Sequence, residues 1–71
     1  MDKQQSKFFK NFGSNVRKAR ESKKFTLEDM QDFGFSPQHF QKVEAGKKAV
    51  ALFTAHRIAQ ALGVKIDDLI K

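Results

Sequence analysis

The amino-acid sequence predicts an all-α fold, a compact bundle of about five short helices. Apolar residues recur at spacings of three and four along most of the chain, which is typical of amphipathic helices, and no stretch alternates as a strand would. Residues that favour helix ends separate these stretches, with Ser or Thr before them and Gly after them. A chain of 71 residues is one small domain, so we expect modest stability.

The charge is strongly positive for a chain of this size. Lys and Arg number 14 against 8 Asp and Glu, which gives a net charge of +6. Such an excess suits a polyanionic partner, although a surplus of surface lysine is the plain alternative. The chain has no cysteine, which excludes disulfide bonds and thiolate metal sites. No apolar run could span a bilayer and no signal peptide is present, so we expect a cytoplasmic location.

The N-terminal part divides into two segments. Residues 1–7 are polar and lack periodicity, so we predict a flexible segment ahead of a domain that occupies residues 8–71. Periodicity then predicts a helix from Phe8 to Ser22. Its apolar side is formed by Phe8, Phe12, Val16 and Ala19.

Two residues of this first helix are unusual. Gly13 lowers the helix propensity, and although we favour a helix that runs through it, a start with Ser14 as the N-cap is the alternative. Arg20 lies beside the apolar side, where a buried charge would need a partner. An arginine that extends into solvent is the alternative there.

A second short helix is predicted to begin at Thr26. Thr26 is a favourable N-cap, and Asp29, three residues later, completes a capping-box-like pair. Gly34 ends this helix, because glycine reaches positive φ at little cost. The apolar positions between them are Leu27, Met30 and Phe33.

A third helix follows at once, with Ser36 as its N-cap, Pro37 at its first position and Gly46 at its end. Phe40 and Val43 give it a buried side. Two helices joined by so tight a turn form a helix-turn-helix, and the second is the candidate reader of DNA. Polar side chains large enough to reach base edges lie between the apolar ones: Gln38, His39, Gln41 and Lys42.

The C-terminal part predicts two more helices. The fourth, with its lead-in, runs from Ala49 to Leu62 and is followed by Gly63 as its C′ residue; Ala51 is a poor N-cap for it. Its apolar face comprises Leu52, Ala55, Ile58, Ala59 and Leu62. A short fifth helix closes the chain with Ile66, Leu69 and Ile70, and with Asp67 and Asp68 in its first turn.

No residue pattern indicates catalysis. His39 and His56 fall on different helices, and neither has further metal ligands at a suitable spacing. The adjacent carboxylates Glu28-Asp29 and Asp67-Asp68 point apart on a helix. Most of the eight phenylalanines are expected in the core, because a platform that stacks single-stranded nucleic acid usually needs a sheet. We therefore predict neither an enzyme nor a bound cofactor or metal.

Three segments resemble the phage-repressor and Cro-like helix-turn-helix family, the XRE type: FGSNVRKARESK, TLEDMQDFGFSPQHFQKVEAGKK and LFTAHRIAQALGVKIDDLI. Together they cover more than four-fifths of the chain. The resemblance implies the lambda-repressor-like DNA-binding fold of five helices. It also implies a bacterial or phage transcriptional regulator that binds double-stranded DNA, usually as a dimer.

The resemblance also implies roles for particular residues. It places Pro37, Gln38, His39 and Lys42 toward the bases of the major groove. It places Lys47 and Lys48 on phosphates, with Arg17 and Lys18 as weaker candidates for phosphate contacts. It pairs Arg20 with Glu44 in a structural ion pair that would link the first and third helices.

The chain also departs from the family pattern. Leu27 stands where a glutamine is common, Lys65 stands where a Ser or Thr often caps the last helix, and the stretch from Met30 to Gly34 is one residue shorter. These departures bear on which DNA sequence is read. A protein-interaction module on the same fold, an antitoxin or an accessory subunit, is the alternative function. The candidate dimer surface is the fifth helix with Leu69 and Ile70, unless both complete the core.

Overall fold

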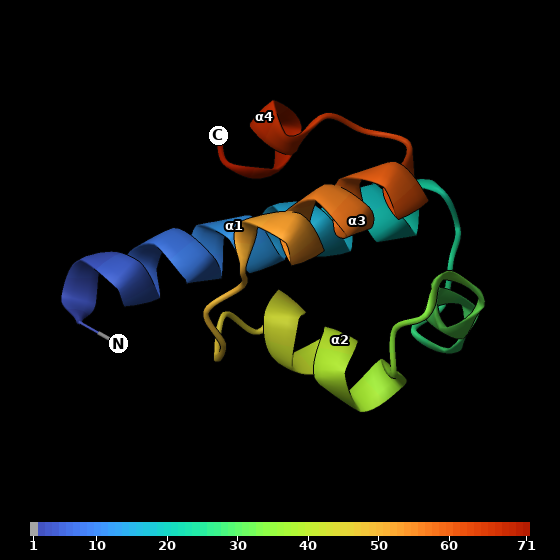
Figure 1. Cartoon of the computed structure of the whole chain (residues 1–71), viewed down its shortest axis with the longest axis horizontal. Coiled ribbons are helices and arrows are strands. Elements are labelled where there is room, and N and C mark those ends of the chain that lie inside the picture. Colours follow the sequence, from blue (N-terminus) through green and yellow to red (C-terminus); the bar gives the residue numbers. More distant parts are fainter. Residues whose placement is uncertain (1) are drawn as a thin grey trace.

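The computed structural model describes residues 2–71, which form helices and contain no strand. Helix α1 contacts α2, α3 and α4, and α2 and α4 lie on opposite sides of the pair formed by α1 and α3 (Figure 1). The predicted all-α architecture of five short helices is thereby confirmed. The elements in chain order are α1 (Lys3–Ser22), the 3₁₀ helix η1 (Glu28–Phe33), α2 (Pro37–Glu44), α3 (Leu52–Leu62) and α4 (Ile66–Leu69).

Helix α1 begins at Lys3, so the predicted start at Phe8 is wrong. A capping box at Asp2 explains the early start. The Asp2 carboxylate accepts a hydrogen bond from the Gln5 backbone N–H at 2.8 Å, and the Gln5 side chain accepts one from the Asp2 backbone N–H at 3.3 Å. These bonds satisfy amides that a helix start otherwise leaves without partners. The helix also runs through Gly13, which rules out the alternative start at Ser14.

The first turns of α1 therefore extend beyond the rest of the fold (Figure 1). Residues 2–5 are exposed, and so are Lys7 and Phe8. Within the segment predicted to be flexible, Met1 lies outside the described residues. The flexibility of the segment and the domain boundary at residue 8 stay predictions.

The second helix is the 3₁₀ helix η1. It begins at Glu28 with Leu27 as its N-cap residue, later than the predicted start at Thr26. Both hydrogen bonds of the predicted pair are nevertheless present: Thr26 Oγ1 accepts from the Asp29 backbone N–H at 3.1 Å, and Asp29 Oδ2 accepts from the Thr26 backbone N–H at 2.7 Å. Six residues in 3₁₀ geometry rise about 12 Å, a distance that takes about eight residues in an α-helix. The 3₁₀ winding therefore makes this stretch longer than an α-helix of six residues would be.

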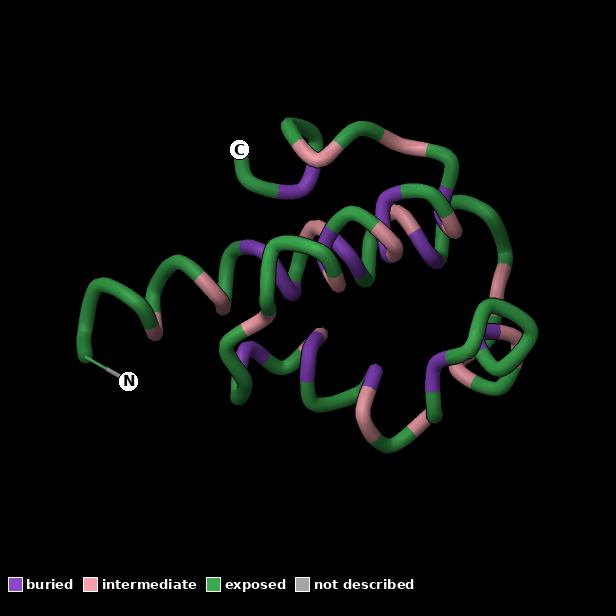
Figure 2. Tube along the Cα trace, viewed as in Figure 1, coloured by how far each residue is buried: buried purple, intermediate pink, exposed green. Residues whose placement is uncertain are grey.

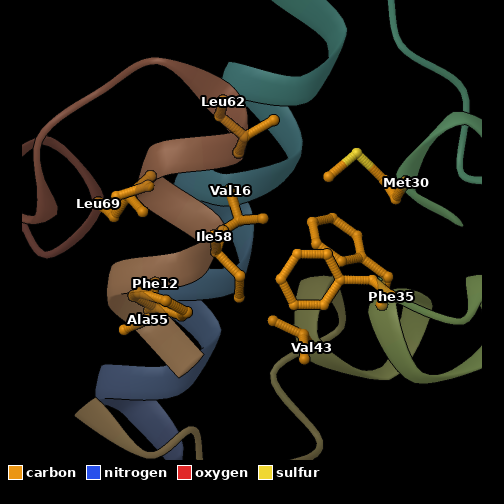
Figure 3. Packing of buried hydrophobic residues seen from close by; sticks show 11 residues of the cluster. Phe12, Val16, Met30, Phe35, Val43, Ala55, Ile58, Leu62 and Leu69 are labelled. Atoms are coloured by element: carbon orange, nitrogen blue, oxygen red, sulfur yellow. The ribbon is translucent and has the colours of Figure 1, made fainter. Parts of the chain in front are cut away.

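The core lies where α1, α2 and α3 meet, and α4 and η1 close it at the edges (Figure 2). Figure 3 shows side chains of α1 and α3 meeting Met30, Phe35 and Val43 across the core. Eight side chains in it are less than 2% exposed: Phe12, Phe40, Met30, Ile58, Leu62, Leu69, Val16 and Val43.

Several predicted core positions differ from the structure. Leu52, which is predicted on the apolar face of the fourth helix, is 76% exposed because it opens the first turn of α3, beyond the neighbouring helices. Leu69 is buried and completes the core, whereas Ile70 is 44% exposed. Among the phenylalanines, Phe12, Phe35 and Phe40 are buried, Phe9 and Phe25 pack against the core, and Phe8, Phe33 and Phe53 are exposed.

Asparagine side chains of α1 hold the end of the chain. Asn15 Nδ2 donates to the Leu69 carbonyl at 3.0 Å, and the Asn11 side chain donates to the Lys71 carbonyl. Within α4, Asp68 Oδ2 accepts from the Lys65 backbone N–H at 3.1 Å. This bond, with one to Lys71, lowers the pKa of Asp68. The Asp68 carboxylate thus provides, at the start of α4, part of the capping that the Lys65 side chain cannot provide.

Candidate nucleic-acid interface

Helix α2 is positioned by local signals that the sequence carries. Ser36 Oγ accepts a hydrogen bond from the His39 backbone N–H at 3.1 Å, and Pro37 occupies the first helical position. Phe40 and Val43 are 0% and 1% exposed, so one side of the helix is fixed in the core. Residues spaced three and four apart lie together on the opposite side of the helix, which faces solvent.

This outer side of α2 forms a shallow hollow of about 320 Å³ with the loop that follows it. Gln38, Lys42 and Lys47, three of the predicted DNA contacts, therefore lie together. Gln41 lies with them. The sequence marks its side chain as large enough to reach base edges but does not include it among the predicted contacts, although its three-residue spacing from Gln38 puts both on one side of a helix. The hollow is lined by Gln38, Gln41, Lys42, Ala45 and Lys47.

The remaining predicted contact residues are arranged differently. Pro37 and His39 are partly buried in the first turn of α2, and Lys48 is exposed beside Lys47. Arg17 pairs with Glu21, Nε to Oε2 at 3.3 Å, on the open surface of α1. Lys18 follows Gly13 by five residues and so points about 140° around the helix from it. Because Gly13 faces α2, Lys18 points away from the candidate interface.

The interface carries positive charge. Glu44 is the only acidic residue between positions 36 and 48, and its carboxylate is bound by Arg20 rather than exposed to the hollow. Lys42, Lys47 and Lys48 are all exposed, so the positive charge beside the hollow is not offset by a free carboxylate of the same segment. Such a surface attracts polyanions.

Arg20 and Glu44 form a buried ion pair behind α2. Arg20 Nε lies 2.6 Å from Glu44 Oε2 and Nη2 lies 3.1 Å from Oε1, which makes the contact bidentate. The side chains are 10% and 7% exposed. Arg20 Nη1 also donates to the Phe25 carbonyl at 2.7 Å. Hydrogen bonding to Glu44 raises the pKa of Arg20 against the opposing effect of burial, so the guanidinium stays charged, and its bidentate contact with Glu44 clamps α2 to α1.

Gly13 brings the backbones of α1 and α2 into contact. A Cβ at this position would lie 2.3 Å from the Val43 carbonyl oxygen and 2.6 Å from that of Glu44. A glycine in the interior of a helix, which local propensity disfavours, is therefore required by packing. The sequence contained no signal for this role, because the contact joins residues thirty positions apart.

Two other kinds of feature are not found among the residues that the structure describes. No group of three or more His, Cys, Asp or Glu residues within 2–71 could hold a metal ion. His39 and His56 stay on separate helices. No helix in the same range has both the length and the apolar character needed to cross a membrane.

Comparison with known proteins gives two kinds of match. The family described as "Helix-turn-helix" matches residues 16–69. The SPbeta prophage-derived uncharacterized HTH-type transcriptional regulator YonR of Bacillus subtilis is 38% identical over 61 residues, which are 84% of this chain and 56% of that protein. The uncharacterized HTH-type transcriptional regulator y4dJ of Sinorhizobium fredii is 36% identical over 59 residues, 82% of this chain and 77% of that protein.

The chain thus spans about half the length of the first relative and about three quarters of the second. No solved structure matches the chain significantly. Both relatives carry the same type of name, and both alignments cover most of this chain.

Proposed function

Because the chain belongs to the XRE-type helix-turn-helix family, we propose that it binds double-stranded DNA in a sequence-specific manner, as a bacterial or phage transcriptional regulator. The observation that carries the proposal is the exposed side of α2. It gathers amide and ammonium groups in one hollow on a helix whose other side is fixed in the core. A rigid helix that presents polar groups in this way suits the width of the major groove.

In this proposal α2, which follows the N-cap Ser36, lies in the major groove. Gln38 bonds an adenine through its amide, and Lys42 reaches a guanine. His39 and Pro37 lie at the helix start, where the proline ring packs against bases but has no hydrogen-bonding group to offer. Gln41 completes the reading side.

Lys47 and Lys48 are proposed to bind phosphates next to the groove. Contacts of this type position the protein and set the salt dependence of binding, whereas base contacts set the sequence preference. Arg17 is a weaker phosphate contact because Glu21 already binds it.

We further propose that the protein binds DNA as a homodimer, since one helix-turn-helix covers only a few base pairs and paired half-sites lie about one helical turn apart. An apolar groove of about 250 Å³ between α1, α3 and α4 is the candidate surface. Leu69 does not contribute to it because the core buries its side chain. The groove is lined by Phe8, Phe9, Phe12, Val50, Leu52, Ala55, Ile66 and Ile70.

The same groove supports a second candidate function, a protein-interaction module such as an antitoxin or accessory subunit. Phe8, Leu52 and Ile70 are 47%, 76% and 44% exposed around it, and clustered exposed apolar side chains mark binding surfaces. In this alternative, binding would depend little on salt, because apolar contacts release few counterions.

Selection from a random double-stranded DNA library tests the proposal. We expect a short palindromic motif with fixed half-site spacing, and an affinity that falls linearly on a log–log plot against salt.

Gln38→Ala and Lys42→Ala should each weaken binding to the enriched duplex by roughly 1–3 kcal/mol. Changing Lys47 and Lys48 together to Ala should weaken all duplexes alike and flatten the salt slope by about 0.9 for each phosphate that is no longer neutralised.

His56→Ala, an exposed position on α3, is the matched control and should bind as the wild type does. An unchanged sequence preference in both Gln38→Ala and Lys42→Ala would contradict the assignment of α2 as the reader. A library with no enriched motif, from a protein whose binding merely tracks salt, would favour the interaction module instead.

A further inference from the structure

Arg57 of α3 contacts both residues that flank Gly34 in the turn of the helix-turn-helix. Its Nη2 donates a hydrogen bond to the Phe33 carbonyl oxygen at 3.1 Å. Its Cζ lies 4.7 Å from the centroid of the Phe35 ring, in a cation–π contact. One partly buried side chain therefore bridges α3, the end of η1 and the start of the segment that leads into α2.

The turn fits closely around this arginine. Gly34 has φ +87°, and a Cβ there would lie 2.8 Å from Arg57 Nη2. Phe35 is 5% exposed, and its ring centroid lies 5.4 Å from that of Phe40 in α2. Contacts thus run without a gap from Arg57 through Phe35 to the buried side of α2.

The bridge acts on the N-terminal end of α2, away from the contacts with α1 at Gly13 and at the Arg20–Glu44 pair. Gly13 and the Arg20–Glu44 pair fix the C-terminal half of α2 against α1. The N-terminal half, which carries Gln38, is attached to the core through Phe40, whose ring packs against that of Phe35. Arg57 holds Phe35 and the Phe33 carbonyl from α3 and so supports this attachment through the turn.

We propose that Arg57 is a positioning residue that fixes the tilt of α2 and thereby sets how strongly the protein discriminates between DNA sequences. The inference rests on the proposed DNA-reading function. Arg57 acts through Phe33 and Phe35 and does not touch DNA. Its planar guanidinium can donate to a carbonyl and stack on a ring at the same time, which the ammonium of a lysine cannot do.

The test compares Arg57→Lys and Arg57→Gln with the wild-type chain. Affinity is measured for the enriched duplex and for a scrambled duplex of equal length, across a series of salt concentrations. Lys3→Gln, at an exposed site in the first turn of α1, is the control that loses the same charge as Arg57→Gln. Residual dipolar couplings of the free proteins report the orientation of α2 relative to α3.

Both Arg57 variants should lose discrimination between the two duplexes by about tenfold, the effect of misplacing one good base contact. Affinity for the scrambled duplex should fall no further in Arg57→Gln than in Lys3→Gln, and Arg57→Lys should keep the wild-type salt slope. The couplings should show a changed orientation of α2 in both Arg57 variants and an unchanged one in Lys3→Gln.

Two results would overturn the inference. Full discrimination in Arg57→Lys, with a shallower salt slope in Arg57→Gln, would make Arg57 a phosphate contact. An unchanged α2 orientation in both variants would remove the positioning role altogether. If the wild-type protein itself fails to discriminate, the proposed function fails, and the couplings still decide whether Arg57 orients α2.

Discussion

The two ends of α2 are held by different kinds of contact. At the C-terminal end, backbone meets backbone at Gly13, and a bidentate ion pair lies almost entirely out of solvent. At the N-terminal end, the contacts are a serine cap, the buried ring of Phe40, a glycine turn and a partly buried arginine. The backbone and ionic contacts with α1 thus lie at one end of α2, whereas Gln38 and His39 of the proposed reading residues lie near the other. We infer that stability and sequence discrimination can be altered separately.

The largest expected effect comes from breaking the C-terminal clamp. Glu44→Ala leaves Arg20 buried without its carboxylate, and it should lower the free energy of unfolding by roughly 3–5 kcal/mol. Urea titration followed by circular dichroism measures the loss. Glu21→Ala removes the exposed partner of Arg17 and should cost at most about 0.5 kcal/mol. Equal losses in the two variants would show that burial of the pair has no energetic importance.

A smaller change in stability is expected from Gly13→Ala at the same end of α2, and its sign is informative. Helix propensity alone would make Gly13→Ala stabilising by about 0.5–1 kcal/mol. The Cβ, however, would lie 2.3 Å from a backbone oxygen that cannot rotate away, so we expect a net destabilisation of about 1–3 kcal/mol. A raised melting temperature in this variant would contradict the close approach of α1 and α2.

The smallest effect on stability is expected at the N-terminal end. Gly34→Ala forces alanine into the left-handed region and should cost about 1–2 kcal/mol. Gly63→Ala, at φ +68°, should cost a similar amount and serves as the control. Only Gly34→Ala should also weaken discrimination between DNA sequences, because its Cβ displaces the Arg57 side chain. If both variants lose discrimination equally, the turn has no special influence on reading.

The features that residue patterns alone predicted correctly are local ones, whereas the Arg20–Glu44 pair was expected only from the family resemblance. Ser36 and Pro37 mark the start of α2 because a cap is formed by residues three apart in the chain, and Phe40 and Val43 mark its buried side by their spacing. Gly63 ends α3 in the same local way. The all-α class was therefore accessible from pattern, whereas the lambda-repressor-like arrangement of the helices was expected from the family resemblance.

The features that the sequence did not predict depend on contacts between distant residues or on small energies. Local propensity makes Gly13 a weak point of α1, and its packing role stays hidden because its partner lies on another helix. Arg57 has no local signal, since the turn it contacts lies more than twenty residues away. The start of α1 depends on two exposed hydrogen bonds between Asp2 and Gln5. A pattern of apolar residues carries no information about such bonds.

Helix α1 combines two extremes of packing within twenty residues. Its first turns extend from the fold, whereas Gly13 and Arg20 contact α2 in the most buried part of the molecule. In hydrogen-exchange terms, we expect amides near Gln5 to exchange through local opening at little cost, and those around Val16 to exchange only when the domain unfolds globally. Because the ion pair joins α1 and α2 beside Gly13, we expect the inner amides of α2 to exchange with the same slow cooperative unit.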